Sequence, residues 1–432
     1  MSRRVVVTGG GCVTPLGTEL AEVWKNLTEG RSGIRPITLF DASDFPIRIA
    51  AEVPDFDISE VGEDPAFWQN HPRQTQFAMA AAIKAVQSAA LDTARLDPVR
   101  FGVYLGCGET FPDIKQLGEL MAASVNGLPH CRRTFLQESL AEKSFWYRPD
   151  VEPNMPSSFI AGMFDAQGPN LNCIAACASS TQSIGAAAEI IRRGDADVML
   201  AGGAHSMIDP AGISGLHRLS VLSNSNERVE KAMRPFDLNR DGFVAGEGGA
   251  VVVLESLEHA QARRADIWGE LVGYASAHDA FRATDTHPDG RAFVHCVREA
   301  LRQAQLAPEQ LDYINAHGTS TRLNDRVETF ALKQSLGEAA YSVPVSSTKS
   351  MMGHSTTACG AVELVIALMA IRTGVIPPTI NYETADPECD LDYVPNTARE
   401  INCRHVLSNS LGFGGQSAAL LVSRFDGRRR PR

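Results

Sequence analysis

The chain has 432 residues, of which 44% are hydrophobic, 7% aromatic and 21% charged, and its formal net charge is −11. A chain of this length and apolar content can bury a substantial core. Because nucleic acid and anionic membranes demand a basic footprint, the negative charge argues against both as main partners. The many glycines (36) and the low aromatic content favour a globular α/β protein.

Short β-branched runs that end in Gly or small polar residues predict buried strands in the first half of the chain. These runs lie at residues 5–9, 103–106, 172–176, 198–203 and 250–255, and Ala-rich helical stretches lie at 76–90 and 179–193. Alternation of this kind predicts an α/β architecture with largely parallel strands.

The second half repeats this plan. Its predicted strands lie at residues 270–275, 313–318, 343–348, 406–412 and 418–423. In both halves a strand, a tight turn and a helix that is small or apolar nearly all round follow one another, at Cys177 in the first half and at Gly353 in the second. Because such helices belong inside a protein, we expect a fused duplication of residues 1–258 and 259–432 with two buried central helices.

The cysteines and the apolar runs bear on the location of the protein. Nine cysteines are spread along the chain without a Cys-x-x-Cys pair, and no secretory signal is visible. These features favour free thiols in a reducing cytoplasm. No stretch approaches the ~18 apolar residues of a membrane-spanning helix. The sequence therefore predicts a soluble protein with no membrane partner.

Three motifs that suggest a metal or a nucleotide are incomplete. Residues 237–242 open like a calcium loop, but the twelfth position is Gly248 and the acid arrives one place early. The glycines of residues 8–17 are followed by Pro15 where a dinucleotide-binding helix would begin. Cys173 and Cys177 lack further metal ligands. We therefore expect neither a metal nor a cofactor.

Cys177 is the first candidate for chemistry. It follows an apolar strand-like run and precedes a helix of small residues. At a strand-to-helix elbow, backbone N–H groups and the helix dipole stabilise a thiolate, so we expect the pKa of this thiol to lie below its ~8.5 reference. Taken alone, a buried Cys beside Ala and Ser fits an inert core residue equally well.

A second set of polar residues also follows predicted strands. His317 ends one predicted strand, Lys349 and His354 follow another, and a glycine-rich turn with Phe413 follows a third. The carboxyl ends of strands are where α/β sheets place their active sites. The sequence therefore predicts that these side chains converge with Cys177, although each His alone is also compatible with an ordinary structural histidine.

Several segments together resemble the elongating β-ketoacyl-(acyl carrier protein) synthases of the thiolase superfamily, and the likeness covers almost the whole chain. The segments that carry it are AlaAlaCysAlaSerSer around Cys177, ArgProPheAsp and ArgAspGlyPheValAlaGlyGluGly within 234–248, AsnAlaHisGlyThrSerThr at 315–321, SerSerThrLysSer with GlyHis at 346–354, and AsnSerLeuGlyPheGlyGly at 409–415. The resemblance implies a thiolase-like duplicated fold, in which two pseudo-twofold-related halves form layers in the order α-β-α-β-α.

The resemblance also implies roles for these residues. Cys177 would accept the acyl chain, and His317 and His354 would promote decarboxylation of malonyl-(acyl carrier protein) by hydrogen bonding to the enolate oxygen. The backbone N–H groups of Cys177 and Phe413 would form the oxyanion hole. Lys349, paired with Glu363, would hold the charge and orientation of the cluster. No metal or redox cofactor is needed for this reaction.

The partners implied are acyl and malonyl carrier proteins, together with a second copy or a chain-length-factor-like subunit. The segment at 389–395 resembles ketosynthase subunits of bacterial aromatic and polyene polyketide systems, so fatty-acid and polyketide pathways both stay open. A Cys-His acyltransferase or thioesterase is the alternative enzyme. The alternative without catalysis is a scaffold subunit of a ketosynthase heterodimer.

Three further expectations concern substrate selection. Phe413, which is flanked by glycines, is predicted to gate the acyl pocket. The long connection at 109–153, which carries Phe135 and Trp146, is predicted to help measure the chain. Arg73 and Arg218 are candidate contacts for an acidic carrier protein.

Overall fold

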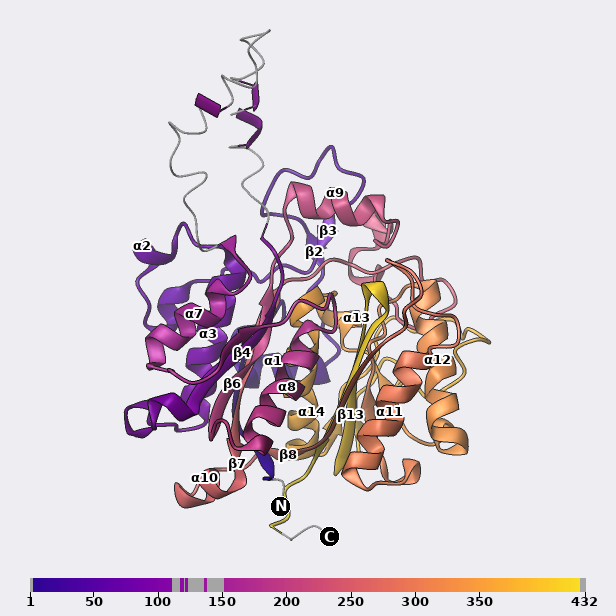
Figure 1. Cartoon of the computed structure of the whole chain (residues 1–432). Coiled ribbons are helices and arrows are strands. Elements are labelled where there is room, and N and C mark those ends of the chain that lie inside the picture. Colours follow the sequence, from indigo (N-terminus) through magenta and orange to yellow (C-terminus); the bar gives the residue numbers. More distant parts are fainter. Residues whose placement is uncertain (1–2, 111–116, 120, 123–135, 138–150, 428–432) are drawn as a thin grey trace.

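The computed structural model describes residues 3–110, 117–119, 121–122, 136–137 and 151–427, and its main feature is one large sheet (Figure 1). Within this described part, ten strands lie in the order β10-β9-β13-β14-β8-β1-β7-β6-β4-β5. The strands of the first half are β1 (Val5–Val13), β4 (Phe101–Cys107), β5 (Asn170–Asn172), β6 (Val198–His205) and β7 (Gly248–Ser256). Those of the second half are β8 (Gly269–His278), β9 (Tyr313–Asn315), β10 (Val345–Ser346), β13 (His405–Gly412) and β14 (Gln416–Ser423).

The strand order is the same in the two halves. Counted outward from the junction of β1 and β8, each half places its first, fifth, fourth, second and third strand in turn. The junction itself is a short antiparallel pairing of Val6 with Glu270 and of Val7 with Gly269. This repetition supports the predicted duplication. We propose residues 1–258 and 259–432 as the halves, with helix α10 (Leu257–Ala262) across the boundary.

The expectation of largely parallel strands was wrong, because the sheet is mixed. Among the described strands, β4 runs parallel to β5 and β6, and β9 runs parallel to β10 and β13. The other five neighbouring pairs are antiparallel. One cause is visible at β13 and β14, which are joined by the short turn Phe413–Gly415, and so short a link permits only antiparallel neighbours.

Helices cover and separate the two halves of the sheet, which gives the expected layers in the order α-β-α-β-α (Figure 1). One outer layer contains α3 (Arg73–Ser88) and α7 (Met155–Phe164), and the other contains α11 (Arg291–Ala304) and α12 (Arg322–Leu336). The central layer consists of α8 (Ser179–Arg193) and α14 (Cys359–Thr373), which pack on each other.

The expectation that no stretch approaches the length of a membrane-spanning helix was wrong for the segment that contains the central helix α14. Residues Thr356–Thr373 are long and apolar enough to cross a membrane, with a mean hydropathy of 1.5, but 78% of the segment is buried inside the protein. Twelve residues of α14 itself are buried. The segment is therefore a buried core helix, as expected for a helix that packs between the two halves of the sheet.

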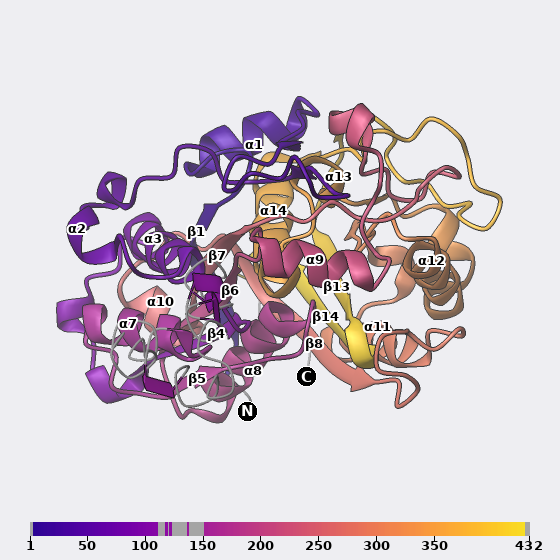
Figure 2. The same ribbon diagram turned by 90° about the horizontal axis from the view of Figure 1, so that it is seen from above.

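Smaller elements decorate the two ends of the layers. The remaining helices are α1 (Leu20–Thr28), α2 (Pro65–Trp68), α9 (Pro210–Arg218) and α13 (Lys349–Met352), and β2 (Arg35–Pro36) with β3 (Ile49–Ala50) and β11 (Val375–Ile376) with β12 (Arg399–Glu400) form two small sheets. Both views place α9 over one end of the central layer, whereas the chain termini lie at the opposite end in Figure 1 (Figures 1 and 2). The candidate site lies at the end beneath α9.

Candidate active site

Cys177 lies at an elbow between β5 and α8. The predicted strand 172–176 was wrong beyond its first residue, because β5 spans Asn170–Asn172 and Ala176 takes a left-handed backbone conformation with φ of +47°. The Ser179 hydroxyl donates to the carbonyl of Ala176 at 2.6 Å and accepts from the N–H of Ala175 at 2.8 Å. These bonds hold the turn, and the Cys177 side chain is buried at 7% exposure.

His317 follows β9 and is fixed through its backbone. The N–H groups of His317 and Gly318 both donate to the carboxylate of Glu328 on α12, each at 2.7 Å. Asn409 on β13 donates to the same carboxylate at 2.6 Å. Sequence reasoning missed Glu328 and Asn409, because a contact between a loop, a helix and a distant strand leaves no pattern in the sequence.

His354 follows α13 and contacts the nucleophile candidate directly. Its Nε2 lies 3.0 Å from the Sγ of Cys177, and its backbone N–H donates to the carbonyl of Val244 at 2.8 Å. The rings of His317 and His354 meet edge to face at 5.3 Å between centroids. The ring of Phe243 packs edge-on against His354 at 5.0 Å. The structure thus brings together the Cys and both histidines, as predicted.

The pKa of the Cys177 thiol does not follow the expectation from the helix dipole. Burial raises this pKa to about 11, although Lys349 and the backbone N–H groups of Phe413 and Cys177 act in the opposite direction. The predicted lowering of the pKa was therefore wrong. Loss of water destabilises the thiolate more than the nearby N–H groups and the Lys349 cation stabilise it. The resting thiol is therefore protonated, and its sulfur lies within hydrogen-bond distance of His354 Nε2.

Both histidines are neutral in the resting site. Burial lowers the pKa of His317 and of His354 well below 6.5, and the positive charge of Lys349 adds to this effect. The side chains are 1% and 2% exposed, respectively. A neutral imidazole carries one N–H and one lone pair, so the pair can donate hydrogen bonds to an oxyanion or accept a proton from the thiol.

Lys349 and Glu363 form an ion pair below this cluster. The Lys349 Nζ hydrogen bonds to Oε1 of Glu363, and the two side chains are 2% and 1% exposed. Burial raises the pKa of Glu363 to about 7 against the effect of Lys349. The charge of Lys349 also acts on the pKa of Cys177, His317 and His354. The pairing of Lys349 with Glu363 that the sequence predicted is therefore present, and the charge of Lys349 contributes to the electrostatic potential at Cys177 and both histidines.

A cavity of about 690 Å³ opens beside the cluster and is lined by Cys177, His317, His354 and Phe413. Phe413 begins the turn after β13 and is half-buried, and Gly414 and Gly415 have φ of +78° and +80°. A Cβ at Gly412 would lie 2.9 Å from the carbonyl oxygen of Ala175, so a glycine there lets the turn approach the Cys177 elbow.

One group of side chains in the cavity has the chemistry of metal ligands. The ligand atoms of Cys177, His317 and His354 lie within 4.8 Å of one another. This group lacks the closed set of four sulfur and nitrogen ligands of a structural zinc site. Outside the lining of this cavity, single buried oxygen atoms of Asn315, Glu363, Ser408 and Asn409 have no hydrogen-bond partner among the described residues.

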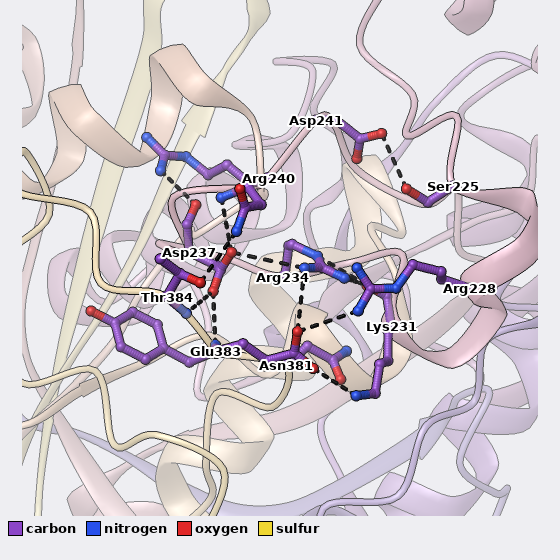
Figure 3. Close-up of polar contacts among 12 residues, drawn as sticks. Ser225, Arg228, Lys231, Arg234, Asp237, Arg240, Asp241, Asn381, Glu383 and Thr384 are labelled. Atoms are coloured by element: carbon purple, nitrogen blue, oxygen red, sulfur yellow. Dashed lines mark hydrogen bonds and ion pairs between the residues drawn. The ribbon is translucent and has the colours of Figure 1, made fainter.

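The segment that resembled a calcium loop links the two halves of the protein (Figure 3). The carboxylate of Asp237 accepts the backbone N–H groups of Glu383 and Thr384 at 2.7 and 2.6 Å. Arg240 pairs with Asp325 of α12 at 3.4 Å and with Asp386 at 2.5 Å. The carboxylate that begins the motif is therefore occupied by backbone donors, and the segment positions the start of α12, which carries Glu328.

Arg73 and Arg218, the two candidate contacts for a carrier protein, lie in different surroundings. Arg73 donates to both carboxylate oxygens of the buried Glu247, so this guanidinium is held by the core. Arg218 ends α9 with its side chain exposed, next to Leu216 and Leu219 at the cavity. Phe135 and Trp146 of the long connection lie outside the described residues.

Comparison with known proteins gives matches along nearly the whole chain. The family models described as "Beta-ketoacyl synthase, N-terminal domain" and "Beta-ketoacyl synthase, C-terminal domain" match residues 2–260 and 268–383. A "3-oxoacyl-[acyl-carrier-protein] synthase 2" of Coxiella burnetii is 43% identical over 429 residues, covering 98% of this chain and 99% of that protein. A "Putative polyketide beta-ketoacyl synthase 1" of Streptomyces halstedii is also 43% identical, with 98% of each chain covered.

Solved structures agree with this assignment of the fold. A type II polyketide ketosynthase, solved in the complex described as "type II PKS acyl-carrier protein in complex with its ketosynthase bound to the hexaketide", has a TM-score of 0.85 and 34% identity, covering 98% of this chain and all of that one. "The ishigamide ketosynthase/chain length factor" has a TM-score of 0.83 and 33% identity, covering 99% of this chain and all of that one.

Proposed function

The chain belongs to the β-ketoacyl synthase family, and from this premise we propose that it extends an acyl chain held as a thioester on Cys177. It is an acyltransferase of fatty-acid or type II polyketide synthesis. The contact of 3.0 Å between Cys177 Sγ and His354 Nε2, inside a cavity that also contains His317, carries the assignment of roles.

The first half-reaction is transfer of the acyl group. The Cys177 thiol gives its proton to His354 as its sulfur attacks the acyl thioester carbonyl. The N–H groups of Cys177 and Phe413 stabilise the oxyanion that forms. The C–S bond to the carrier breaks, the carrier sulfur takes the proton from His354, and acyl-Cys177 with a free carrier thiol remains. Because burial keeps the pKa of Cys177 high, the sulfur loses its proton only during this attack.

The second half-reaction is condensation. The malonyl thioester loses its carboxylate as carbon dioxide, and the enolate oxygen accepts hydrogen bonds from neutral His317 and His354. The enolate carbon attacks the acyl-Cys177 carbonyl and forms the new C–C bond. The Cys177 thiolate leaves and takes up a proton, which restores the thiol and releases the β-ketoacyl carrier. During condensation, Lys349, paired with Glu363, helps to keep both histidines neutral by raising the cost of a second positive charge.

Carrier proteins and a related subunit are the partners that we propose. One solved relative is described as a carrier protein in complex with its ketosynthase, and the descriptions of two others name a chain length factor. Leu171 of the edge strand β5 is 43% exposed, and Ile174, two residues after this strand, is 55% exposed, which supports a subunit contact there. That subunit is a second copy or a chain-length-factor-like protein. The eight cysteines within the described residues are free thiols, which supports a cytoplasmic location.

A malonyl-carrier assay tests the proposal. Purified protein is acylated with an acyl carrier, and radiolabelled malonyl carrier is then added. We expect release of labelled carbon dioxide together with a β-ketoacyl carrier, and loss of both with Cys177→Ala. Cys173→Ala is the matched control, because Cys173 lies four residues away and outside the cavity lining. Release of free acid without condensation would favour a thioesterase, and failure to acylate Cys177 would favour a scaffold subunit.

A further inference from the structure

A further histidine, His205, lines the same cavity and has no role in the reaction described above. It ends β6, and its side chain is 5% exposed. Its Nδ1 lies 3.0 Å from the hydroxyl of Thr357, in the turn that leads from His354 into α14. Its Nε2 has no hydrogen-bond partner within the residues that the structure describes. Because a buried polar atom is costly to leave unpaired, this nitrogen is a candidate contact for a ligand.

The neighbouring hydroxyl assigns the proton on the ring. The Thr357 hydroxyl donates its single hydrogen to the carbonyl of Ala204 at 3.3 Å. Its oxygen can then only accept from His205, so Nδ1 carries the hydrogen of the imidazole. The free Nε2 is left as a lone pair. It therefore offers a hydrogen-bond acceptor, and the matching ligand group is a donor.

The His205 ring fits into the cavity wall because residue 108 is a glycine. A Cβ at Gly108, which also lines the cavity, would lie 2.6 Å from Cε1 and 2.9 Å from Nδ1 of His205. The imidazole thus fills the space that a side chain at position 108 would take. Around it, Ile174, Met207 and Leu216 give the cavity an apolar lining. In such a wall, a polar atom without a partner sets orientation and specificity.

The ring is suited to recognition and not to proton transfer. Burial lowers the pKa of His205 to about 4, so the ring is neutral at physiological pH. The sulfur of Cys177 already has His354 as its hydrogen-bond partner. His205 acts on His354 through space, by lowering its pKa. A neutral, fixed acceptor beside the site can hold a substrate group, but it has no proton to give at Nε2.

We propose that Nε2 of His205 accepts a hydrogen bond from a hydroxyl on the acyl chain bound to Cys177, so that the cavity selects hydroxylated acyl chains over unsubstituted ones. This inference rests on the proposed function, because it names a substrate class for that same cavity. His205 is then a specificity-determining residue. A hydroxyl that enters without this acceptor is buried unpaired, which is how a polar contact discriminates between substrates.

Competition between matched substrates tests the proposal. Acyl carriers of one chain length are prepared unsubstituted, with a hydroxyl and with a ketone at C3, C5 or C7. Acylation of Cys177 is followed by intact-protein mass spectrometry, and condensation is followed in the malonyl-carrier assay. The variants are His205→Leu, which removes the acceptor, and His205→Gln, whose amide oxygen replaces Nε2. His295→Leu is the control, because His295 is exposed on α11.

We expect the wild type to prefer one hydroxylated chain over its unsubstituted match by about tenfold in kcat/KM, as one net hydrogen bond allows. His205→Leu should abolish this preference, and His205→Gln should restore part of it. An unchanged ratio in His205→Leu, or a preference for the ketone, overturns the inference while condensation of the unsubstituted chain still supports the proposed function. Loss of acylation for every chain in the wild type would overturn the proposed function itself.

Discussion

Replacement of Lys349 by Met should destabilise the protein increasingly as the pH rises above about 7. Lys349 and its partner Glu363 are 2% and 1% exposed. Burial raises the pKa of Glu363 to about 7, and Lys349 is the main influence that lowers it. Without the cation this pKa rises further. The carboxyl of the folded variant therefore stays protonated at pH values where the wild-type carboxyl is ionised.

The size of the effect follows from the pKa. An unfolded Glu has a pKa of about 4.3, so in both proteins burial of this carboxyl reduces stability between about pH 4.3 and 7. Above pH 7 only the wild type gains from ionisation, by about 1.4 kcal/mol per pH unit. The unfolding entropy is about 2.1 cal/mol/K per residue, summed over 432 residues. Relative to the wild type, the Tm of Lys349→Met should therefore fall by about 1.5 °C for each pH unit above 7.

Thermal unfolding between pH 6 and 8.5 measures this dependence. Glu363→Gln provides the contrast, because it leaves the buried Lys349 cation without its partner and should cost about 3–5 kcal/mol. Lys84→Met is the control, since its partner Glu19 is 71% exposed. A Tm difference between wild type and Lys349→Met that stays constant from pH 6 to 8.5 would refute the reasoning, because the pKa of Glu363 would then not depend on Lys349.

Three further predictions concern activity. His354→Ala should slow both acylation and condensation by about a hundredfold, whereas His317→Ala should slow condensation alone. Equal acylation rates for wild type and His354→Ala in single-turnover mass spectrometry would contradict a role for the contact between His354 and Cys177 in acylation. Phe413→Ala should change the relative acylation rates of short and long chains, whereas equal losses together with a lower Tm would identify a packing role. Arg218→Glu should raise KM for the acyl carrier and weaken its salt dependence, and an unchanged KM would place docking elsewhere.

The sequence predicts the fold well where one residue pattern decides one element. The central helix α8 has the predicted bounds, Ser179–Arg193, because an elbow precedes it and Gly194, in the left-handed conformation, ends it. The antiparallel strand pairs were not predictable in the same way. Neighbouring strands in the sheet, such as β1 and β7, are far apart in the chain, and an apolar run does not record the direction of its partner.

Some residues of the candidate site could be predicted from the sequence, and others could not. Cys177, His317 and His354 each lie at or just after the end of a predicted strand, so their convergence could be predicted from sequence. Glu328, which receives the backbone of the His317 loop, could not be, because a buried acid on a helix resembles a solvated one in sequence. The pKa of Cys177 was predicted in the wrong direction for a related reason: local N–H donors are visible in the sequence, but the depth of burial depends on the whole fold.

The duplication itself explains why His205 and Cys177 share one cavity. Because α8 corresponds to α14 and β6 to β13, Thr357 takes the place of Cys177, each two residues before its central helix. Cys177 faces the turn that follows β13, whose Phe413 N–H acts on its sulfur. Thr357, in turn, contacts His205 at the end of β6. The two crossed contacts are equivalent by the pseudo-twofold. One holds the proposed nucleophile beside its proposed oxyanion donors, and the other presents a hydroxyl and an imidazole, which supports the proposed role of His205 in holding the acyl chain.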